Sequence, residues 1–267
     1  MPGPIGRQLA GDGPVSPVDA WLRPVKARTA PRLALVCVPH AGGGATAFSA
    51  WPEILPPEVE VLAVQLPGRE TRFGEVPLRA FEPIVDAVVE AIGARVRTPY
   101  ALYGHSMGAL LAFEVTRRIQ SRRPLHLFVA GCRAPQLVPV GRRRHCLPHD
   151  ELLRWLRELD GTAAEVVAHA ELMRLLMPAL RADLAVTDRY RYHLGPPVDV
   201  DLTAFGGAAD PEVPLHALSA WSRQTSGRFR QHIFPGGHFF VTGARSGMLR
   251  LMVDELAPAL EGAASRP

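Results

Sequence analysis

The chain has 267 residues, a length that fits one large domain and is sufficient to bury a sizeable core. Apolar residues make up 47% and charged residues 21%, a globular composition that excludes a disordered chain. The 30 basic and 26 acidic residues leave a net charge of +4 and are scattered, which argues against nucleic-acid binding. No run approaches the roughly 18 apolar residues of a membrane helix, and the three cysteines lack CxxC spacing. We therefore expect a cytoplasmic protein that does not contact membranes.

In chain order, a segment rich in Pro and Gly, residues 1–30, predicts a loose N-terminal extension. Strand-like apolar runs then alternate with helical patterns, which predicts one α/β domain over residues 31–262. Runs that are apolar throughout are typical of parallel strands buried on both faces, so we expect a mostly parallel central sheet flanked by helices. The strand-like runs are 33–38, 61–66, 100–105, 125–131, 201–207 and 229–234, and the main helical stripes lie near 81–92, 110–119 and 248–260.

Residues of about 133–198 interrupt this alternation with helical patterns only. Leucines recur at helical spacing over 152–159 and again over 172–180, where Pro178 is expected to kink or end the helix. A helical insertion between strands usually covers a site at the carboxyl edge of the sheet. We therefore predict a helical lid, here called the lid segment (133–198); the alternative is that it enlarges the core.

The strongest local motif is Gly104-His105-Ser106-Met107-Gly108, which stands between a strand-like run and a helical pattern. A G-x-S-x-G sequence in this setting is typical of a nucleophile elbow, a turn so tight that small residues must flank the serine. The turn presents the serine hydroxyl above the sheet. The motif therefore predicts Ser106 as a nucleophile.

A serine hydroxyl is a weak nucleophile and needs a general base that is oriented by an acid. In this kind of fold the chain order is Ser, then Asp or Glu, then His. His238 follows the last strand-like run in a glycine-rich loop, and Asp210 follows the run before it. We predict His238 as the base and Asp210 as the acid, with Glu212 as a weaker substitute for Asp210.

Attack on an acyl carbon also requires backbone N–H groups that stabilise the negative charge on its oxygen. One donor is expected at Met107, directly after the serine, and another in the loop 39–44 that follows the first strand-like run. This loop also fits a loose GxGxxA dinucleotide fingerprint over 42–47. That alternative requires an acidic residue at the end of the next strand, where Leu66 stands instead.

Six motifs, two of which contain the elbow and the loop 39–44 described above, occur in order between about residues 33 and 260. They are PHAGGGATAFSAWP (39–52), QLPGRE (65–70), YGHSMGALLAFEV (103–115), LRADLAVTDRYRY (180–192), GGAADPEVP (206–214) and FPGGHFF (234–240). With them, the sequence resembles the type II thioesterases, the free-standing editing enzymes that accompany modular polyketide and nonribosomal peptide synthases. The extension, residues 1–30, lies outside this resemblance.

The resemblance implies an α/β-hydrolase fold with a helical lid, and a catalytic triad of Ser106, Asp210 and His238. It also implies that the backbone amides of Ala41 and Met107 form the oxyanion hole. Such enzymes remove aberrant or stalled acyl groups from the phosphopantetheine thiol of acyl or peptidyl carrier domains, without a cofactor or metal of their own. A monomer is expected.

Three expectations leave alternatives open. Met173, Met177 and Phe239 line an acyl pocket or belong to the core. Arginine clusters at 117–123 and 142–144 steer an acidic carrier domain or form a solvated surface. The rival functions are a small-molecule carboxylesterase or acyltransferase of the same fold, and a binding module that has lost catalysis.

Overall fold

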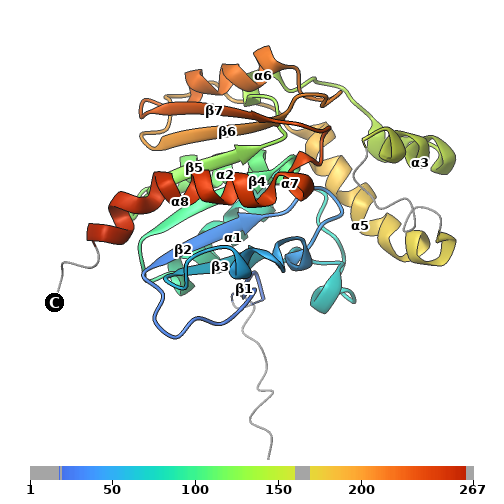
Figure 1. The fold of residues 1–267 in the computed structure, drawn as a ribbon. Coiled ribbons are helices and arrows are strands. Elements are labelled where there is room, and N and C mark those ends of the chain that lie inside the picture. Colours follow the sequence, from blue (N-terminus) through green and yellow to red (C-terminus); the bar gives the residue numbers. More distant parts are fainter. Residues whose placement is uncertain (1–17, 19, 160–168, 263–267) are drawn as a thin grey trace, which may run out of the picture.

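A computed structural model describes residue 18, residues 20–159 and residues 169–262. Seven strands in these residues form one sheet in the order β1-β3-β2-β4-β5-β6-β7, in which β1 is antiparallel to β3 and all other pairs are parallel (Figure 1). The strands are β1 (Leu22–Pro24), β2 (Leu33–Val38), β3 (Val59–Val64), β4 (Tyr100–His105), β5 (His126–Ala130), β6 (Asp201–Gly207) and β7 (Phe229–Phe234).

Helices cover both faces of the sheet. Successive side chains of a strand point to opposite faces, so a strand that is apolar throughout presents an apolar surface on each face. Val36 of β2 packs in a core cluster with residues of α1 (Phe81–Arg95) and α2 (Met107–Arg118). Its neighbour Leu35 packs in a second cluster with residues of α8 (Arg245–Gly262). The central strands are therefore buried on both sides, as their continuous apolar sequences predict.

Short helices complete the fold. They are α6 (Leu215–Ser219), α7 (Phe240–Gly243) and the 3-10 helices η1 (Ala45–Phe48), η2 (Trp51–Glu53), η3 (Glu70–Arg72), η4 (Pro135–Leu137), η5 (Arg144–Cys146) and η6 (Ala220–Gln224).

Three strands differ from the sequence prediction, β5 only by one residue at each end, since it covers 126–130 instead of 125–131. β3 begins and ends two residues earlier than the predicted run 61–66, since Leu66 and Pro67 already belong to the loop after it. β1 lies inside the segment predicted as a loose extension, where Leu22 is fully buried and pairs with Val64. Three residues without a helical or alternating pattern carry too little local signal to predict a strand at the sheet edge. Residues 1–17 and 19 of that extension lie outside the described residues.

The described part of the lid segment contains two longer helices, α3 (His149–Glu158) and α5 (Ala170–Arg189), which lie together beyond one end of the sheet (right in Figure 1). Residues 160–168 of the predicted lid lie outside the described residues. Helix α5 runs through Pro178, so the proline does not end it. Tertiary packing accounts for this, because leucine and methionine side chains from both sides of Pro178 form one buried cluster with α3.

Candidate active site

Ser106 lies in the sharp turn between β4 and α2, with φ +56° and ψ −115°. Non-glycine residues rarely adopt a positive φ, and such strain is often found at active sites. Both flanking glycines are required by space. A Cβ atom on Gly104 would lie 2.1 Å from the Gly108 carbonyl oxygen, and one on Gly108 would lie 2.2 Å from the Val38 carbonyl oxygen. The turn thus has the geometry of a nucleophile elbow.

The structure brings Ser106, His238 and Asp210 together at the carboxyl edge of the sheet. The distance from His238 Nε2 to Ser106 Oγ is 3.0 Å, and that from His238 Nδ1 to Asp210 Oδ2 is 2.9 Å. Asp210 follows β6 and His238 follows β7, so two adjacent parallel strands deliver both groups to one edge. Asp210 is 9% exposed and His238 is 5% exposed, which keeps both groups largely away from water.

Glu212, the weaker candidate for the acid, points to different partners. Its backbone N–H donates to Asp210 Oδ1 over 2.8 Å, whereas its carboxylate binds Arg142 and accepts from Trp155 Nε1 over 3.4 Å. The side chain that bonds to His238 is therefore that of Asp210.

Two further histidines lie beside His238. Burial lowers the pKa of His40 to about 4, assisted by the charges of His238 and Arg69. Burial likewise holds the pKa of His105 well below its usual range, with His238 and His40 adding to the effect. Because a carbonyl can only accept, His105 Nε2 donates to the His238 carbonyl oxygen, at 3.0 Å. Both neighbours are thus uncharged at neutral pH, and one of them fixes the backbone that carries His238.

A cleft opens over Ser106 between the sheet edge and the lid segment. Its walls include Ala41, Met107 and Phe239, three of the residues predicted for the site. Helix α5 contributes Leu180, Leu184 and Thr187, and α3 contributes Trp155 and Leu156. Cys132 also lines the cleft, but burial raises the pKa of its thiol to about 12, with the Asp210 charge adding to the effect.

The two methionines predicted for the acyl pocket are placed differently. Met173 and Met177 are 3% and 8% exposed and pack in the α3–α5 cluster with Leu152, Leu156 and Leu180. The cleft wall on this side is formed by Leu180 and Leu184, one or two helical turns further along α5. The structure therefore places Phe239 in the cleft and these methionines in the core of the lid segment.

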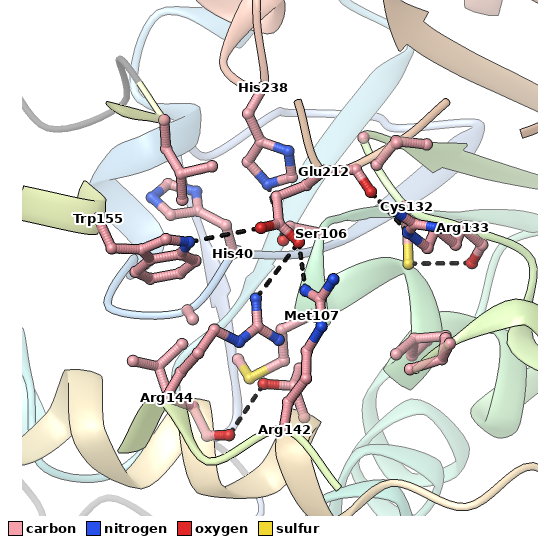
Figure 2. Close-up of a pocket in the computed structure, with 18 of the residues that line it drawn as sticks. His40, Ser106, Met107, Cys132, Arg133, Arg142, Arg144, Trp155, Glu212 and His238 are labelled. Atoms are coloured by element: carbon pink, nitrogen blue, oxygen red, sulfur yellow. Dashed lines mark hydrogen bonds and ion pairs between the residues drawn. The ribbon is translucent and has the colours of Figure 1, made fainter. Parts of the chain in front are cut away.

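One wall of the cleft is polar, a feature that the sequence did not predict. Trp155, Arg142 and Arg144 converge on the Glu212 carboxylate, and all four side chains line the cleft together with Ser106 (Figure 2). Burial opposes ionisation of the Glu212 carboxyl group. The hydrogen bond from Arg142 and the charge of Arg144 outweigh this effect and lower the pKa of Glu212 overall. Arg133 Nε donates to the Glu212 carbonyl oxygen over 2.6 Å.

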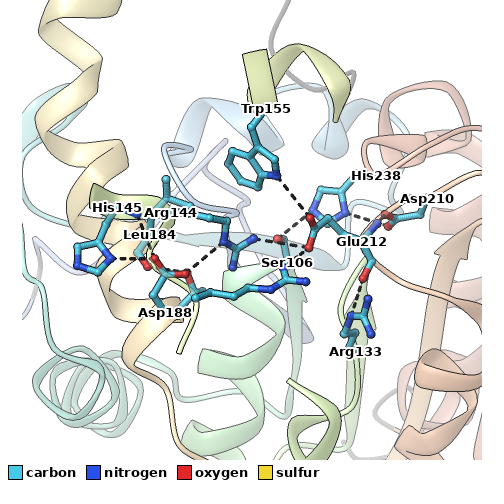
Figure 3. Close-up of polar contacts among 12 residues, drawn as sticks. Ser106, Arg133, Arg144, His145, Trp155, Leu184, Asp188, Asp210, Glu212 and His238 are labelled. Carbon is cyan, nitrogen blue, oxygen red and sulfur yellow. Dashed lines mark hydrogen bonds and ion pairs between the residues drawn. The ribbon is translucent and has the colours of Figure 1, made fainter. Parts of the chain in front are cut away.

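The polar wall continues into α5 through Asp188 (Figure 3). This carboxylate accepts from Arg144 Nε at 3.2 Å and from His145 at 3.0 Å (backbone N) and 2.8 Å (Nδ1). Burial opposes its ionisation, yet the hydrogen bonds from His145 lower the pKa of Asp188 overall. The arginine cluster 142–144 was visible in the sequence, but its partners stand about 40 and 70 positions away, so no local pattern identified them.

Within the part of the chain that the structure describes, no three His, Cys, Asp or Glu side chains are grouped so that they could hold a metal ion. In the same residues, no helix has the length and apolar character needed to cross a bilayer.

The model of the thioesterase domain family matches residues 34–254. The gramicidin S biosynthesis protein GrsT of Aneurinibacillus migulanus is 41% identical over 245 residues, which cover 91% of this chain and 96% of that protein. The thioesterase PikA5 of Streptomyces venezuelae is 38% identical over 225 residues, covering 83% of this chain and 80% of the relative.

Solved structures of thioesterases are also similar to this chain. The type II thioesterase BorB from the borrelidin biosynthetic cluster superposes with a TM-score of 0.84 at 39% identity, covering 89% of this chain and 98% of that one. The RedJ thioesterase from the prodiginine pathway of Streptomyces coelicolor gives a TM-score of 0.81 at 42% identity, covering 88% and 97%.

Proposed function

The chain belongs to the thioesterase family, as a type II thioesterase of polyketide and nonribosomal peptide biosynthesis, and we propose that Ser106, His238 and Asp210 are its catalytic triad. The observation that carries this proposal is the continuous pair of short contacts, 3.0 Å from Ser106 to His238 and 2.9 Å from His238 to Asp210. These are the distances that a nucleophile, a base and an orienting acid require.

In the acylation step, His238 Nε2 takes the proton of Ser106 Oγ while the oxygen attacks the thioester carbon. Asp210 accepts a hydrogen bond from Nδ1–H, which holds the imidazole in the tautomer whose Nε2 can accept the proton. When the tetrahedral intermediate collapses, the carbon–sulfur bond breaks and His238 returns the proton to the departing thiolate. An acyl ester on Ser106 remains.

In the deacylation step, His238 removes a proton from water, and the resulting hydroxide attacks the acyl ester. Collapse breaks the bond to Ser106 Oγ, which recovers the proton from His238, and the free carboxylic acid leaves. No cofactor takes part in either step. His40 and His105 are uncharged at neutral pH, so the imidazolium that forms transiently on His238 faces no cationic neighbour among these rings.

The negative charge that develops on the carbonyl oxygen is stabilised by the backbone amides of Ala41 and Met107. Both residues line the cleft beside Ser106. Met107 is the first residue of α2, so its N–H lies at the positive end of the helix dipole. Preorganised donors of this kind are worth about 3 kcal/mol each in comparable enzymes.

The substrates in this proposal are acyl groups on the phosphopantetheine arm of acyl or peptidyl carrier domains. GrsT and BorB, which resemble this chain over almost their entire length, are described as a biosynthesis protein of gramicidin S and a type II thioesterase of a borrelidin cluster. Removing aberrant or stalled acyl groups would free the carrier thiol for further synthesis. The alternative, a carboxylesterase acting on small molecules, would use the same triad.

The deciding experiment measures acyl release from a panel of acyl-loaded carrier domains beside matched small thioesters and oxygen esters, with Ser106→Ala as the control. We expect hydrolysis that depends on Ser106 and is faster on the carriers. Activity on free oxygen esters alone would favour the carboxylesterase, and hydrolysis that persists in Ser106→Ala would contradict the proposed triad.

A further inference from the structure

Two motifs that the proposed mechanism leaves without a role, QLPGRE (65–70) and LRADLAVTDRYRY (180–192), meet at one buried ion pair. Arg69 lies in the loop after β3 and Asp183 lies in α5, and their side chains are 4% and 1% exposed. The guanidinium donates to both carboxylate oxygens, over 2.5 Å from Nη1 and 2.8 Å from Nη2. A buried ion pair often stabilises a fold no better than well-packed apolar residues, so stability need not be the role of this one.

The further contacts of this pair lead to the loop 40–46, which carries the amide of Ala41. The N–H of Gly42 donates to Asp183 Oδ2 over 2.7 Å, and Arg69 Nη1 donates to the Gly43 carbonyl oxygen over 3.1 Å. Gly42 has φ +81°, a backbone conformation that residues with a side chain rarely adopt. The Gly42 N–H and the Gly43 carbonyl, which lie just after Ala41, are thus each held by one hydrogen bond to a charged side chain, which is the stronger kind.

The far end of the same loop is held by the residue next to Arg69. The Glu70 carboxylate accepts from the backbone N–H groups of Ala45 and Thr46, both at 3.1 Å, and from the Thr46 hydroxyl at 2.6 Å. Gln65 Nε2 donates to the Arg69 carbonyl oxygen over 3.2 Å and so stiffens the segment that carries both charges. The QLPGRE motif therefore anchors the loop at two places.

Asp183 also links this loop to the cleft wall, because it stands on α5 between two residues that line the cleft. Leu180 precedes it by three positions and Leu184 follows it directly. Leu180 reaches the loop itself, since a Cβ atom on Gly42 would lie only 3.2 Å from Leu180 Cδ1. One helix therefore both lines the cleft and contacts the loop.

We propose that Arg69 and Asp183 are positioning residues, whose ion pair aims the Ala41 amide at the developing oxyanion and couples it to the α5 wall of the acyl pocket. This role rests on the proposed function, in which Ala41 supplies one oxyanion donor. Loss of the pair leaves Ser106, His238 and Asp210 in place but lets the loop relax. It therefore weakens binding of the tetrahedral state more than binding of the substrate.

The test compares two ketones of equal length as inhibitors of hexanoyl-N-acetylcysteamine thioester hydrolysis. In 1,1,1-trifluorooctan-2-one, Ser106 Oγ bonds to the carbonyl carbon, its proton moves to His238, and the ketone oxygen becomes an oxyanion. Octan-2-one occupies the same cleft without forming this adduct. For Asp183→Asn we expect kcat to fall about tenfold to a hundredfold with KM little changed. The inhibition constant of the trifluoroketone should rise about tenfold relative to that of octan-2-one.

The matched control is Asp188→Asn, which removes another buried carboxylate of α5 that binds Arg144 and His145 and makes none of the contacts to the loop described above. It should lower Tm to a similar degree but leave the ratio of the two inhibition constants within about twofold of wild type. If Asp183→Asn does not fold, the double variant Arg69→Met/Asp183→Leu replaces it, since it leaves no unpaired buried charge.

The positioning role is overturned if a folded variant without the ion pair shows the wild-type ratio of the two inhibition constants. If Ser106→Ala is inactive in the same experiments, the proposed triad still stands. A ratio that changes equally in Asp188→Asn overturns the positioning role as well, because the effect is then a general loosening of the lid segment. Hydrolysis that persists in Ser106→Ala instead overturns the proposed function, and the positioning role with it.

Discussion

The sheet edge and the lid segment form opposite walls of the same cleft, yet they are built on different principles. At the sheet edge, adjacent parallel strands end together, so the loops after β4, β6 and β7 bring Ser106, Asp210 and His238 into contact. The lid segment is joined to the rest of the chain by ion pairs such as Arg142–Glu212 and Arg69–Asp183, whose partners are 70 and 114 positions apart.

Because of this difference, the two walls contribute different properties to the cleft. The geometry of the proposed triad follows from strand order and one strained turn, and the hydrogen bonds that join its three side chains involve neither α3 nor α5. The shape and charge of the cleft wall that the lid segment forms depend on long-range polar contacts, and single substitutions can remove these contacts. We therefore expect substitutions at the sheet edge to change kcat or folding. Substitutions in the lid segment should change KM, except at Asp183, where kcat should fall because the Ala41 amide is displaced.

The largest effect is expected from the triad itself. Ser106→Ala should lower kcat by about 10⁶-fold and Asp210→Ala by about 10⁴-fold, because the acid only orients the base. Steady-state kinetics on a small thioester, with circular dichroism to confirm folding, measures both. A silent Asp210→Ala would mean that another acid, with Glu212 the first candidate, orients His238.

The next largest effect is expected from adding a side chain to a glycine of the elbow, where there is no space for it. Gly108→Ala places a methyl group 2.2 Å from the Val38 carbonyl oxygen and should lower the free energy of unfolding by about 3 kcal/mol. Gly93→Ala is the matched control in α1, where nothing lies within 4 Å of the added carbon. It should stabilise by about 0.5–1 kcal/mol, since alanine favours helix. Urea unfolding of both variants checks this pair, and equal effects would contradict the packing described for the elbow.

Acidification should destabilise the sheet through a histidine that is buried at the start of β5. Burial lowers the pKa of His126 in β5 to about 4, whereas the unfolded chain takes up that proton near pH 6.5. Unfolding therefore becomes easier as pH falls from 6.5 to 4, by at most about 3 kcal/mol from this group. In the carboxyl groups of Asp188 and Glu212, by contrast, hydrogen bonds and nearby arginine charges outweigh burial, lower the pKa and favour the ionised forms.

The measurement is urea unfolding of wild type and His126→Gln at pH 7 and at pH 4. The variant lacks the buried imidazole, so it should lose less stability than wild type between the two pH values. An identical loss in both proteins would show that protonation of His126 does not govern this range.

The smallest effect is expected at the polar wall. Glu212→Gln removes the charge that pairs with Arg142 and Arg144 but keeps the backbone N–H that donates to Asp210. KM should rise about threefold to tenfold, corresponding to about 1 kcal/mol, while kcat stays within about twofold. Glu75→Gln, which breaks a pair with Arg72 whose Glu75 side chain is 49% exposed, is the control and should change neither constant. A fall in kcat alone would mean that Glu212 acts on the triad.

Sequence patterns predicted most of the sheet, because fully apolar runs identify strands buried on both faces. They also indicated the order Ser106, Asp210, His238, because parallel strands deliver their following loops to one edge. β1 was missed, since its pairing with β3 has no local signature. The placement of Met173 and Met177 could not be predicted either, because helical periodicity does not tell whether a stripe faces a cleft or another helix. Arg69 and Asp183 stood in recognisable motifs, but only the fold shows that they meet.

The most direct test of Ser106 as the nucleophile is to trap the acyl group on the enzyme. Hexanoyl-N-acetylcysteamine thioester is mixed with the protein, the reaction is quenched within milliseconds, and peptides are analysed by mass spectrometry. We expect a hexanoyl group on Ser106, which accumulates further in Asp210→Ala if deacylation slows, and none in Ser106→Ala. An acyl group on any other residue, or turnover that persists in Ser106→Ala, would show that Ser106 is not the nucleophile.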